Sequence, residues 1–202
     1  MKIQYRNIIL RDRKESDIDD EIRWKTTDTQ WALWDAPWEM EEELAKFDPV
    51  SYRKEELAGL ARQKEGFRWS FEVDTLDGHH IGRVSSYLVD QNYEWVSSLK
   101  GRETETFYHT LGVDIHESCF WGKNLGTQAL TAFIQYHLEN GLSDLCLQTW
   151  SGNLRMVHVA EKLGFAVCDR EVGFRQVCGE TYDGLTFKLD ESAFQNFLAN
   201  NP

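Results

Sequence analysis

One segment of the sequence combines residues suited to binding a phosphate with the position of a helix start. The segment 121–127, Trp-Gly-Lys-Asn-Leu-Gly-Thr, follows a β-rich stretch and runs directly into a helical pattern. A helix N-terminus exposes unpaired N–H groups and a partial positive charge, which suits an anion. Gly122 and Gly126 allow close approach to the backbone, Lys123 adds a cation, and Asn124 tolerates the left-handed conformation. The segment predicts an anion site, with an ordinary strand-to-helix turn as the alternative.

The segment matches neither of two common phosphate loops. No lysine follows Gly126, so it is not a Walker loop, and it is not Gly-x-Gly-x-x-Gly either. A nucleotide-binding protein is therefore disfavoured. A second stretch follows, in which Asn153 is of a helix N-cap type, 155–163 has one apolar face, and Gly164 closes the helix. Its plainest interpretation is a capped amphipathic helix.

Polar side chains at the end of the expected strand 106–115 are candidates for proton transfer. A carboxylate or a histidine can take up a proton, directly or through water. Strand alternation puts Asp114 and His116 on one face and Glu117 on the other, unless a bulge intervenes. Glu117 is slightly favoured over Asp114 as the base, and Asp35 from the N-terminal region is a further candidate. The alternative is that each carboxylate is simply solvated and that His116 is a polar loop residue.

Three tryptophans near the N-terminus have helical spacing. Trp31, Trp34 and Trp38 fall at i, i+3 and i+7, although Pro37 interrupts that helix. They form either a face packed on the core or the wall of a pocket that, with Asp35, suits a cation.

The elements that position these residues follow from periodicity and turn signals. A capping box at Ser16 and Asp19 starts a helix that runs to about residue 24. The expected strands are 8–11, 67–73, 80–89, 106–115, 145–147, 165–168 and 185–189, and the further helices are 41–47, 50–65, 127–140 and 155–163, with a helical turn from 190. This order predicts a mixed α/β or α+β fold rather than a βαβ array.

Composition narrows the class of protein. The 202 residues carry 22 basic and 34 acidic side chains, a net charge of −12, which argues against nucleic acid. No apolar run exceeds four residues and the N-terminus has no apolar region, so we expect neither a membrane span nor a secretory signal. Four cysteines without a Cys-x-x-Cys pair predict reduced thiols in a cytoplasmic protein with no metal site. With no linker or repeat, 1–202 is expected to be one domain.

Together the two stretches resemble the GCN5-related N-acetyltransferase (GNAT) superfamily, and within it the branch of ribosomal-protein alanine N-acetyltransferases. The family's pyrophosphate loop reads Gln/Arg-x-x-Gly-x-Gly/Ala, at 121–126 here, and Asn153 and the run 161–165, Glu-Lys-Leu-Gly-Phe, match its next helix. Two departures stand out. Asn124 occupies a family glycine, and Ala160 stands where many relatives have a tyrosine general acid.

The resemblance implies a fold and a set of contacts. It implies a central mixed, mostly antiparallel twisted sheet of about six to seven strands flanked by helices, with the family's strands 4 and 5, here about 106–116 and 144–149, splayed apart around pantetheine. The residues implied to bind the donor acetyl-CoA are Ile115, His116, Glu117, Gly122, Lys123, Asn124, Leu125, Gly126, Thr127, Asn153 and Lys162. The region of Trp31, Trp34, Asp35 and Trp38 is implied to lie over the acceptor.

The function implied is transfer of an acetyl group from acetyl-CoA to a primary amine, by direct attack in a ternary complex and without a metal. The acceptor is a protein N-terminus or a small amine, and the enzyme a monomer or homodimer. The alternative is a GNAT-fold protein that binds acyl-CoA without catalysis, which Asn124 and Ala160 motivate.

Overall fold

The computed structural model describes residues 1–61 and 66–201, without the side chain of Glu41. The part of the expected helix 50–65 that falls on 62–65 lies outside the described residues. The chain divides into two compact units, unit 1 (Met1–Val84 and Val113–Ala132) and unit 2 (Ser85–Gly112 and Phe133–Pro202). The expectation of a single domain stays a prediction, since compactness alone does not decide whether two units fold together.

One sheet of eight strands, in the order β1-β2-β3-β4-β5-β6-β8-β7, runs through the chain. The strands are β1 (Lys2–Tyr5), β2 (Ile8–Arg11), β3 (Ser70–Thr75), β4 (His80–Val89), β5 (Tyr108–Ile115), β6 (Cys146–Trp150), β7 (Phe165–Val177) and β8 (Glu180–Leu189). The mixed, mostly antiparallel fold is confirmed, but the expected six to seven strands were too few. The additional strand is β1, which is only four residues long and pairs with β2, Ile3 opposite Leu10.

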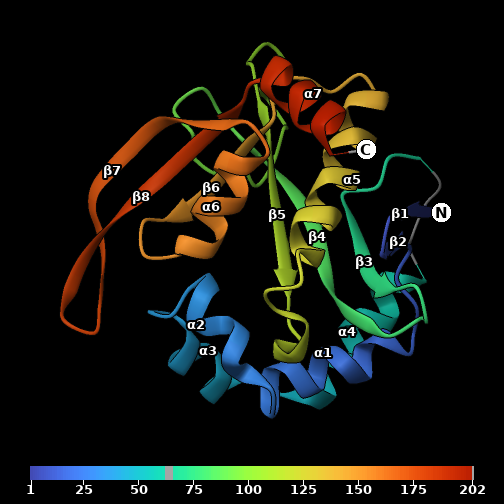
Figure 1. The fold of residues 1–202 in the computed structure, drawn as a ribbon. Helices are drawn as coiled ribbons and strands as arrows, with labels where there is room; N and C mark the ends of the chain where they lie inside the picture. Colours follow the sequence, from blue (N-terminus) through green and yellow to red (C-terminus); the bar gives the residue numbers. More distant parts are fainter. Residues whose placement is uncertain (62–65, 202) are drawn as a thin grey trace. The chain divides into compact units, whose positions relative to one another are not determined.

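Unit 1 carries most of the helices. They are α1 (Asp17–Thr26), the 3₁₀ helix η1 (Thr29–Trp31), α2 (Ala32–Asp35), α3 (Met40–Lys46), α4 (Pro49–Leu60), the 3₁₀ helix η2 (Ser118–Phe120) and the first half of α5 (Leu125–Glu139). Figure 1 shows α1 to α4 gathered at the end of unit 1 toward which β5 points. The buried side chains of Leu10, Phe71 and Ile81 form part of the core beneath them.

The predicted capping box at the start of α1 is wrong. Ser16 has helical dihedral angles and its side chain caps no N–H group. The carboxylate of Asp17 instead accepts from the amide of Lys14, which precedes the helix, at 2.6 Å. Arg11 holds the same carboxylate with two bonds of 2.6 and 2.8 Å, so an ion pair to β2 fixes the beginning of the helix.

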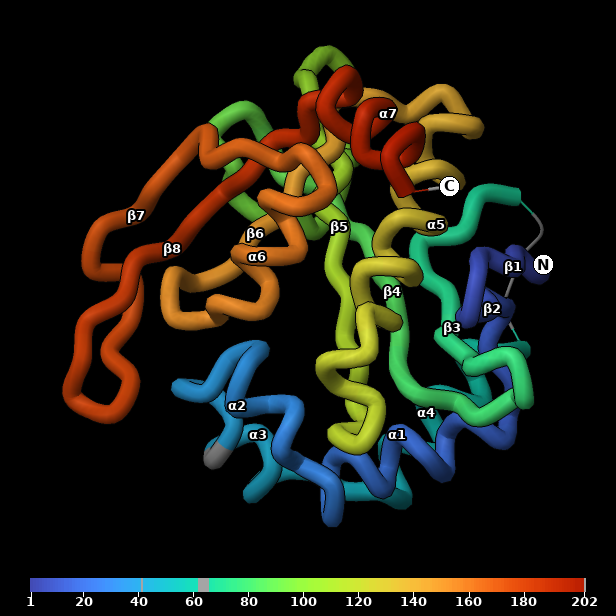
Figure 2. Tube along the Cα trace, viewed as in Figure 1, coloured from blue at the N-terminus to red at the C-terminus, as the bar shows by residue number. Residues whose placement is uncertain are grey.

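Unit 2 contains the C-terminal strands with α6 (Leu154–Lys162), α7 (Glu191–Asn200) and the rest of α5. β7 and β8 form a long antiparallel hairpin, which Figure 2 traces well past the end of β6. β5 and β6 pair in parallel at Thr110 and Cys146, the only position at which their described residues are in register. A single paired position at the start of both strands is what the resemblance implied for strands that splay apart.

The glycine that ends α6 has less room than the one that ends α5. Gly164 and Gly141 both have positive φ values, +89° and +76°. A Cβ at Gly164 would lie 2.9 Å from the Cβ of Ala193 and 2.9 Å from the nitrogen of Phe194, whereas one at Gly141 would meet nothing within 4 Å.

We therefore expect Gly164→Ala to destabilise the protein more than Gly141→Ala. Both variants should lose roughly 1–2 kcal/mol for the left-handed backbone, and Gly164→Ala should lose a further 1–3 kcal/mol or so for overpacking. Urea unfolding of the two variants measures the difference. Equal losses would contradict the packing described for α7 against the end of α6.

No helix in the described residues has the length and hydropathy needed to cross a membrane. All four cysteines are described and none forms a disulfide.

Candidate active site

The end of β5 contains a bulge. The amides of His116 and Glu117 both donate to one carbonyl, that of Ile81 on β4, at 2.9 and 3.4 Å. Two residues of one strand thus oppose one residue of the next, which bends the strand locally and redirects its side chains. The resemblance implied that this backbone faces the thioester. In this conformation the two amides already have an acceptor within the protein.

Gly82 makes room for this bulge. A Cβ at Gly82 would lie 2.0 Å from the carbonyl oxygen of Asp114. No side chain fits at such a distance, so the approach of β5 to β4 depends on glycine at this position. The sequence allowed for a bulge here but did not identify Gly82 as the residue that makes it possible.

Asp114 stands on β5 just before the bulge and is half-buried. Burial raises the pKa of its carboxyl to about 7, and the charge of Asp35 on α2 raises it further, while Arg83 and Lys25 act in the opposite direction. Within the described residues, no hydrogen bond or ion pair holds this carboxylate. A carboxylate with a pKa near neutrality and no fixed partner is suited to accept a proton.

Glu117 is in a different environment. Its Oε1 atom accepts a hydrogen bond from the indole Nε1 of Trp24 at 3.0 Å and forms an ion pair with Arg23. The bond to Glu117 raises the pKa of the Arg23 guanidinium, although burial acts against it. Glu117 is therefore held in place by α1, and the geometry favours Asp114 over Glu117 as a base.

His116 lies between two tryptophan rings. It stacks on Trp24 with ring centroids 4.3 Å apart and an angle of 5°, and meets the edge of Trp31 at 4.6 Å. Burial lowers its pKa to about 3, and the positive charges of His80, Lys25 and Arg83 act in the same direction. The ring is thus neutral at pH 7. Its Nδ1 is a buried atom without a hydrogen-bond partner in the described part of the chain.

The predicted tryptophan helix is interrupted before Trp38. Trp31 ends η1, Trp34 lies in α2, and α2 ends at Asp35, before Pro37. Trp31 reaches the end of β5 through its contact with His116, and its Nε1 donates to the carbonyl of Trp24 at 2.9 Å. The indole of Trp38 instead donates to Glu39 at 3.0 Å.

Lys25 places a cation of the protein among aromatic rings in the same region. Its Nζ lies 5.7 Å from the ring centre of Trp31 and 5.9 Å from those of Phe47 and Tyr52. This is the distance range of cation–π contacts. Trp31, Phe47 and Tyr52 therefore surround a cation that the chain itself supplies.

The loop from β5 to α5 has the backbone that the sequence predicted. Gly122 and Asn124 have φ values of 71° and 63°, both in the left-handed region. α5 begins at Leu125, and its first turn closes with the amide of Gln128 donating to the carbonyl of Asn124 at 3.1 Å. The amides of Leu125, Gly126 and Thr127 are those that a helix N-terminus leaves without an intrahelical acceptor.

Side chains at both ends of this loop fix its path. The indole of Trp121 donates to the carbonyl of Ile115 at 2.6 Å, and Lys123 extends its Nζ over the ring of Phe120 at 5.1 Å. A Cβ at Gly126 would lie 3.5 Å from Ile115, an ordinary contact, so packing alone does not require glycine there.

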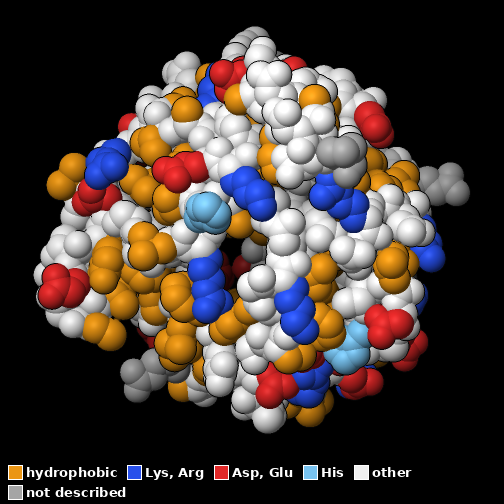
Figure 3. All heavy atoms as spheres, viewed as in Figure 1, with side chains coloured by type: hydrophobic (Ala, Val, Ile, Leu, Met, Phe, Trp, Pro, Cys, Tyr) orange, Lys and Arg blue, Asp and Glu red, His pale blue; other side chains and the backbone are white. Residues whose placement is uncertain are grey.

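Figure 3 shows lysine or arginine side chains over this loop, and mixed acidic and basic side chains over α1.

Asn153 and Lys162 belong to unit 2. Asn153 caps α6, since its Oδ1 accepts from the amide of Met156 at 3.1 Å, as predicted for an N-cap residue. Lys162 is the last residue of α6 and is exposed. Their expected contacts with the donor stay predictions from the resemblance. No group of His, Cys, Asp and Glu side chains in the described residues could hold a metal ion.

The arrangement adds residues that the sequence did not single out. Arg23, Trp24, Lys25 and His80 contribute charge or rings around the end of β5. Asp20 and Arg23, spaced i and i+3 on α1, were a detectable signal of an ion pair. The partners on β4 and β5 lie far away in the sequence and gave no local signal.

Comparison with known proteins connects this geometry to a family. The family model described as "Acetyltransferase (GNAT) domain" matches residues 7–166. A search of curated proteins finds no match.

Solved structures match over nearly the whole chain. A GNAT-family acetyltransferase from Bacillus anthracis has 13% identity and a TM-score of 0.65, with 95% of this chain and 99% of that chain covered. RimL, a ribosomal L7/L12 alpha-N-protein acetyltransferase in complex with coenzyme A, has 14% identity and a TM-score of 0.68, with 93% and 97% covered. A chimera of the spermidine N-acetyltransferase SpeG from Vibrio cholerae and hSSAT has 15% identity and a TM-score of 0.62, with 94% and 99% covered. At these identities the likeness concerns the fold.

Proposed function

Because this chain belongs to the GNAT acetyltransferase family, we propose that it transfers an acetyl group from acetyl-CoA to a primary amine by direct attack within a ternary complex. The observation that carries the proposal lies in unit 1. Asp114, with a pKa of about 7, precedes on one continuous segment a loop whose left-handed residues lead into the N-terminus of α5. A base and an anion site thus follow one another within about a dozen residues.

The donor is assigned to the β5–α5 loop. Its pyrophosphate carries negative charges, and Lys123 with the amides of Leu125 to Thr127 offers a cation and hydrogen-bond donors to them. This local positive site is needed because the whole chain carries a net charge of −12. That a RimL structure holds coenzyme A supports the choice of donor.

The acceptor reaches Asp114 from the side of α2. At pH 7 a primary amine is mostly an ammonium ion, which must lose a proton before its nitrogen can attack the thioester carbonyl. Asp114 takes that proton, and the neutral amine attacks the thioester carbonyl. The C–N bond forms, the C–S bond breaks, and CoA leaves as the thiolate, which takes up the second proton that the nitrogen loses. Trp31, Trp34, Asp35 and Trp38 are the proposed wall of this site, because aromatic rings and a carboxylate suit a cation.

Two of the similar structures suggest the class of acceptor, since one is named for a ribosomal protein and another for spermidine. We propose a protein N-terminus or a small amine. The buried Nδ1 of His116 is a polar atom available to contact either of them.

Amine-dependent release of CoA thiol from acetyl-CoA tests the function. The panel contains an N-terminal peptide, a polyamine, an aminosugar and a simple monoamine, with buffer alone as the control. We expect release well above buffer hydrolysis with at least one amine. Binding of acetyl-CoA in calorimetry without release by any amine would favour the non-catalytic alternative, and absence of binding would contradict both.

Substitution of Asn124 tests the donor loop. Asn124→Gly should keep the Kd for CoA within about threefold, since glycine adopts the left-handed conformation at no steric cost. Asn124→Ala should weaken binding by roughly 5- to 30-fold, the equivalent of about 1–2 kcal/mol for a left-handed residue with a Cβ. Isothermal titration with CoA measures both. Equal affinities in the two variants would show that this backbone conformation does not matter for the donor.

A further inference from the structure

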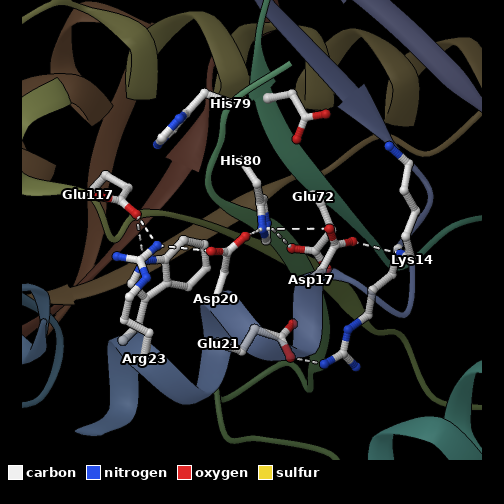
Figure 4. Close-up of polar contacts among 12 residues, drawn as sticks. Lys14, Asp17, Asp20, Glu21, Arg23, Glu72, His79, His80 and Glu117 are labelled. Atoms are coloured by element: carbon white, nitrogen blue, oxygen red, sulfur yellow. Dashed lines mark hydrogen bonds and ion pairs between the residues drawn. The ribbon is translucent and has the colours of Figure 1, made fainter. Parts of the chain in front are cut away.

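A continuous series of polar contacts connects β3 with the end of β5 through α1. Figure 4 shows it as Glu72, His80, Asp20, Arg23 and Glu117 in turn. His80 lies 3.1 Å from Glu72 through Nε2 and 3.1 Å from Asp20 through Nδ1. Arg23 continues from Asp20 at 2.9 Å to Glu117. The five residues come from separate parts of the sequence between Asp20 and Glu117, and all of them belong to unit 1.

Contacts between aromatic rings follow a second path from His80. The ring of His80 contacts Trp24 at a centroid distance of 4.8 Å, and Trp24 stacks on His116 at 4.3 Å. The same indole donates to Glu117. Both paths therefore pass through His80 and reach the two residues that follow Ile115.

The geometry requires His80 to be charged. Both ring nitrogens face carboxylates, and only the imidazolium form has two N–H donors. Glu72 is 1% exposed and His80 7%, and a neutral ring, with its single N–H, would leave either Glu72 or Asp20 facing a ring nitrogen that cannot donate. Burial lowers the pKa of His80, but the hydrogen bond and charge of Glu72 and the charge of Asp17 outweigh it, and the net shift is upward.

The charged and titratable groups around His80 come from three elements. α1 contributes Asp17, 3.7 Å away, and Asp20. β3 contributes Glu72, which also has Arg83 at 3.9 Å, and the segment directly after β5 contributes His116. The negative groups are in direct contact with His80, so they dominate.

We propose that His80 is a positioning residue for acetyl transfer: it fixes Arg23 and Trp24, and through them Glu117 and His116, beside Asp114. This inference rests on the proposed function. His80 touches neither of the reacting groups in this account. It acts on the orientation of the bulge side chains that border the acceptor.

Two substitutions of His80 each keep one of its two hydrogen bonds and remove the other. Asparagine places its amide nitrogen near the position of Nδ1 and can still donate to Asp20, whereas glutamine places it near Nε2 and can still donate to Glu72. We expect His80→Asn to keep kcat within about threefold of wild type and His80→Gln to lower it roughly tenfold or more, since only the first keeps the path to Arg23. His79→Gln, at the exposed neighbouring position, is the matched control and should leave kcat unchanged.

Stability and an NMR signal separate positioning from a merely structural role. His80→Gln, which satisfies the buried Glu72, should unfold at the higher temperature of the two variants and yet be the less active. The His116 ring proton resonance, shifted by the Trp24 ring, should move in His80→Gln and stay in His80→Asn. Activity that follows stability, or an unmoved resonance in both variants, would overturn the proposal. An inactive wild-type protein would instead count against the proposed function.

The pH dependence of stability supplies a further check. Because the folded-state pKa of His80 is raised, its contribution is fully present below the unfolded value of about 6.5. It is lost as the pH rises through the folded-state pKa. The difference in free energy of unfolding between wild type and either variant should therefore shrink with rising pH, and a difference that grows would contradict the charged state of His80.

Discussion

Asp114→Asn is expected to lower kcat/KM for the amine by about 10²- to 10⁴-fold, the usual contribution of a general base. The asparagine amide cannot accept the proton that the attacking ammonium must lose. The same change removes a carboxylate whose pKa is raised by burial, so the variant should be as stable as the wild type at pH 7 or more stable. Steady-state kinetics and thermal unfolding measure the two effects.

The pH dependence of kcat/KM should show in which direction each neighbouring charge shifts the pKa of Asp114. In the wild type, kcat/KM should rise with pH through about 7 as Asp114 loses its proton. Asp35→Asn removes a negative charge that raises the pKa of Asp114, so the rise should move to lower pH. Lys25→Met removes a positive charge that lowers this pKa, so the rise should move to higher pH. Shifts in the same direction for both variants would contradict the role of Asp114.

Gly82→Ala is expected to affect stability and activity together. The new Cβ would lie 2.0 Å from the Asp114 carbonyl oxygen, so β5 must move away from β4. Overpacking of this kind costs roughly 1–3 kcal/mol. A displacement of about 1 Å at the base can lower the rate by about 10²-fold. Urea unfolding and amine-dependent thiol release measure these losses.

Gly112→Ala is the matched control for this prediction. Gly112 lies on β5 itself, and a Cβ there would meet its nearest atom, Oγ of Ser85, at 3.9 Å. We expect little change in either measurement, or a slight gain in stability from the loss of unfolded-state entropy. If both glycine variants behaved alike, the close approach of β5 to Gly82 would not matter to the site.

The residue types in the loop between β5 and α5 were sufficient to predict its backbone conformation. The glycines and Asn124 predicted a left-handed turn before a helix, and Gly122 and Asn124 adopt those angles. Helix α5 begins two residues before the expected start at 127, because the carbonyl of Asn124 already accepts from the amide of Gln128. The N-cap at Asn153 was likewise predicted from the neighbouring sequence alone.

The rest of the site depends on contacts between distant segments. Arg23 reaches Glu117 across 94 residues, and no periodicity within α1 contains that information. The sequence therefore ranked Glu117 above Asp114 as the base, whereas the contacts of Glu117 with Arg23 and Trp24 favour the reverse order. The Gly82 contact is similarly invisible, since a lone glycine in a strand indicates a bulge only once its neighbour is known.

The most direct test follows the acetyl group. The wild-type protein is incubated with acetyl-CoA labelled in its acetyl group, with and without the amine that gives the fastest thiol release. We expect label on the amine in proportion to the thiol released, and no label on the protein when the amine is left out. Label on the protein before the amine is added would contradict direct attack. The absence of label on every amine of the panel would contradict the proposed acetyl transfer itself.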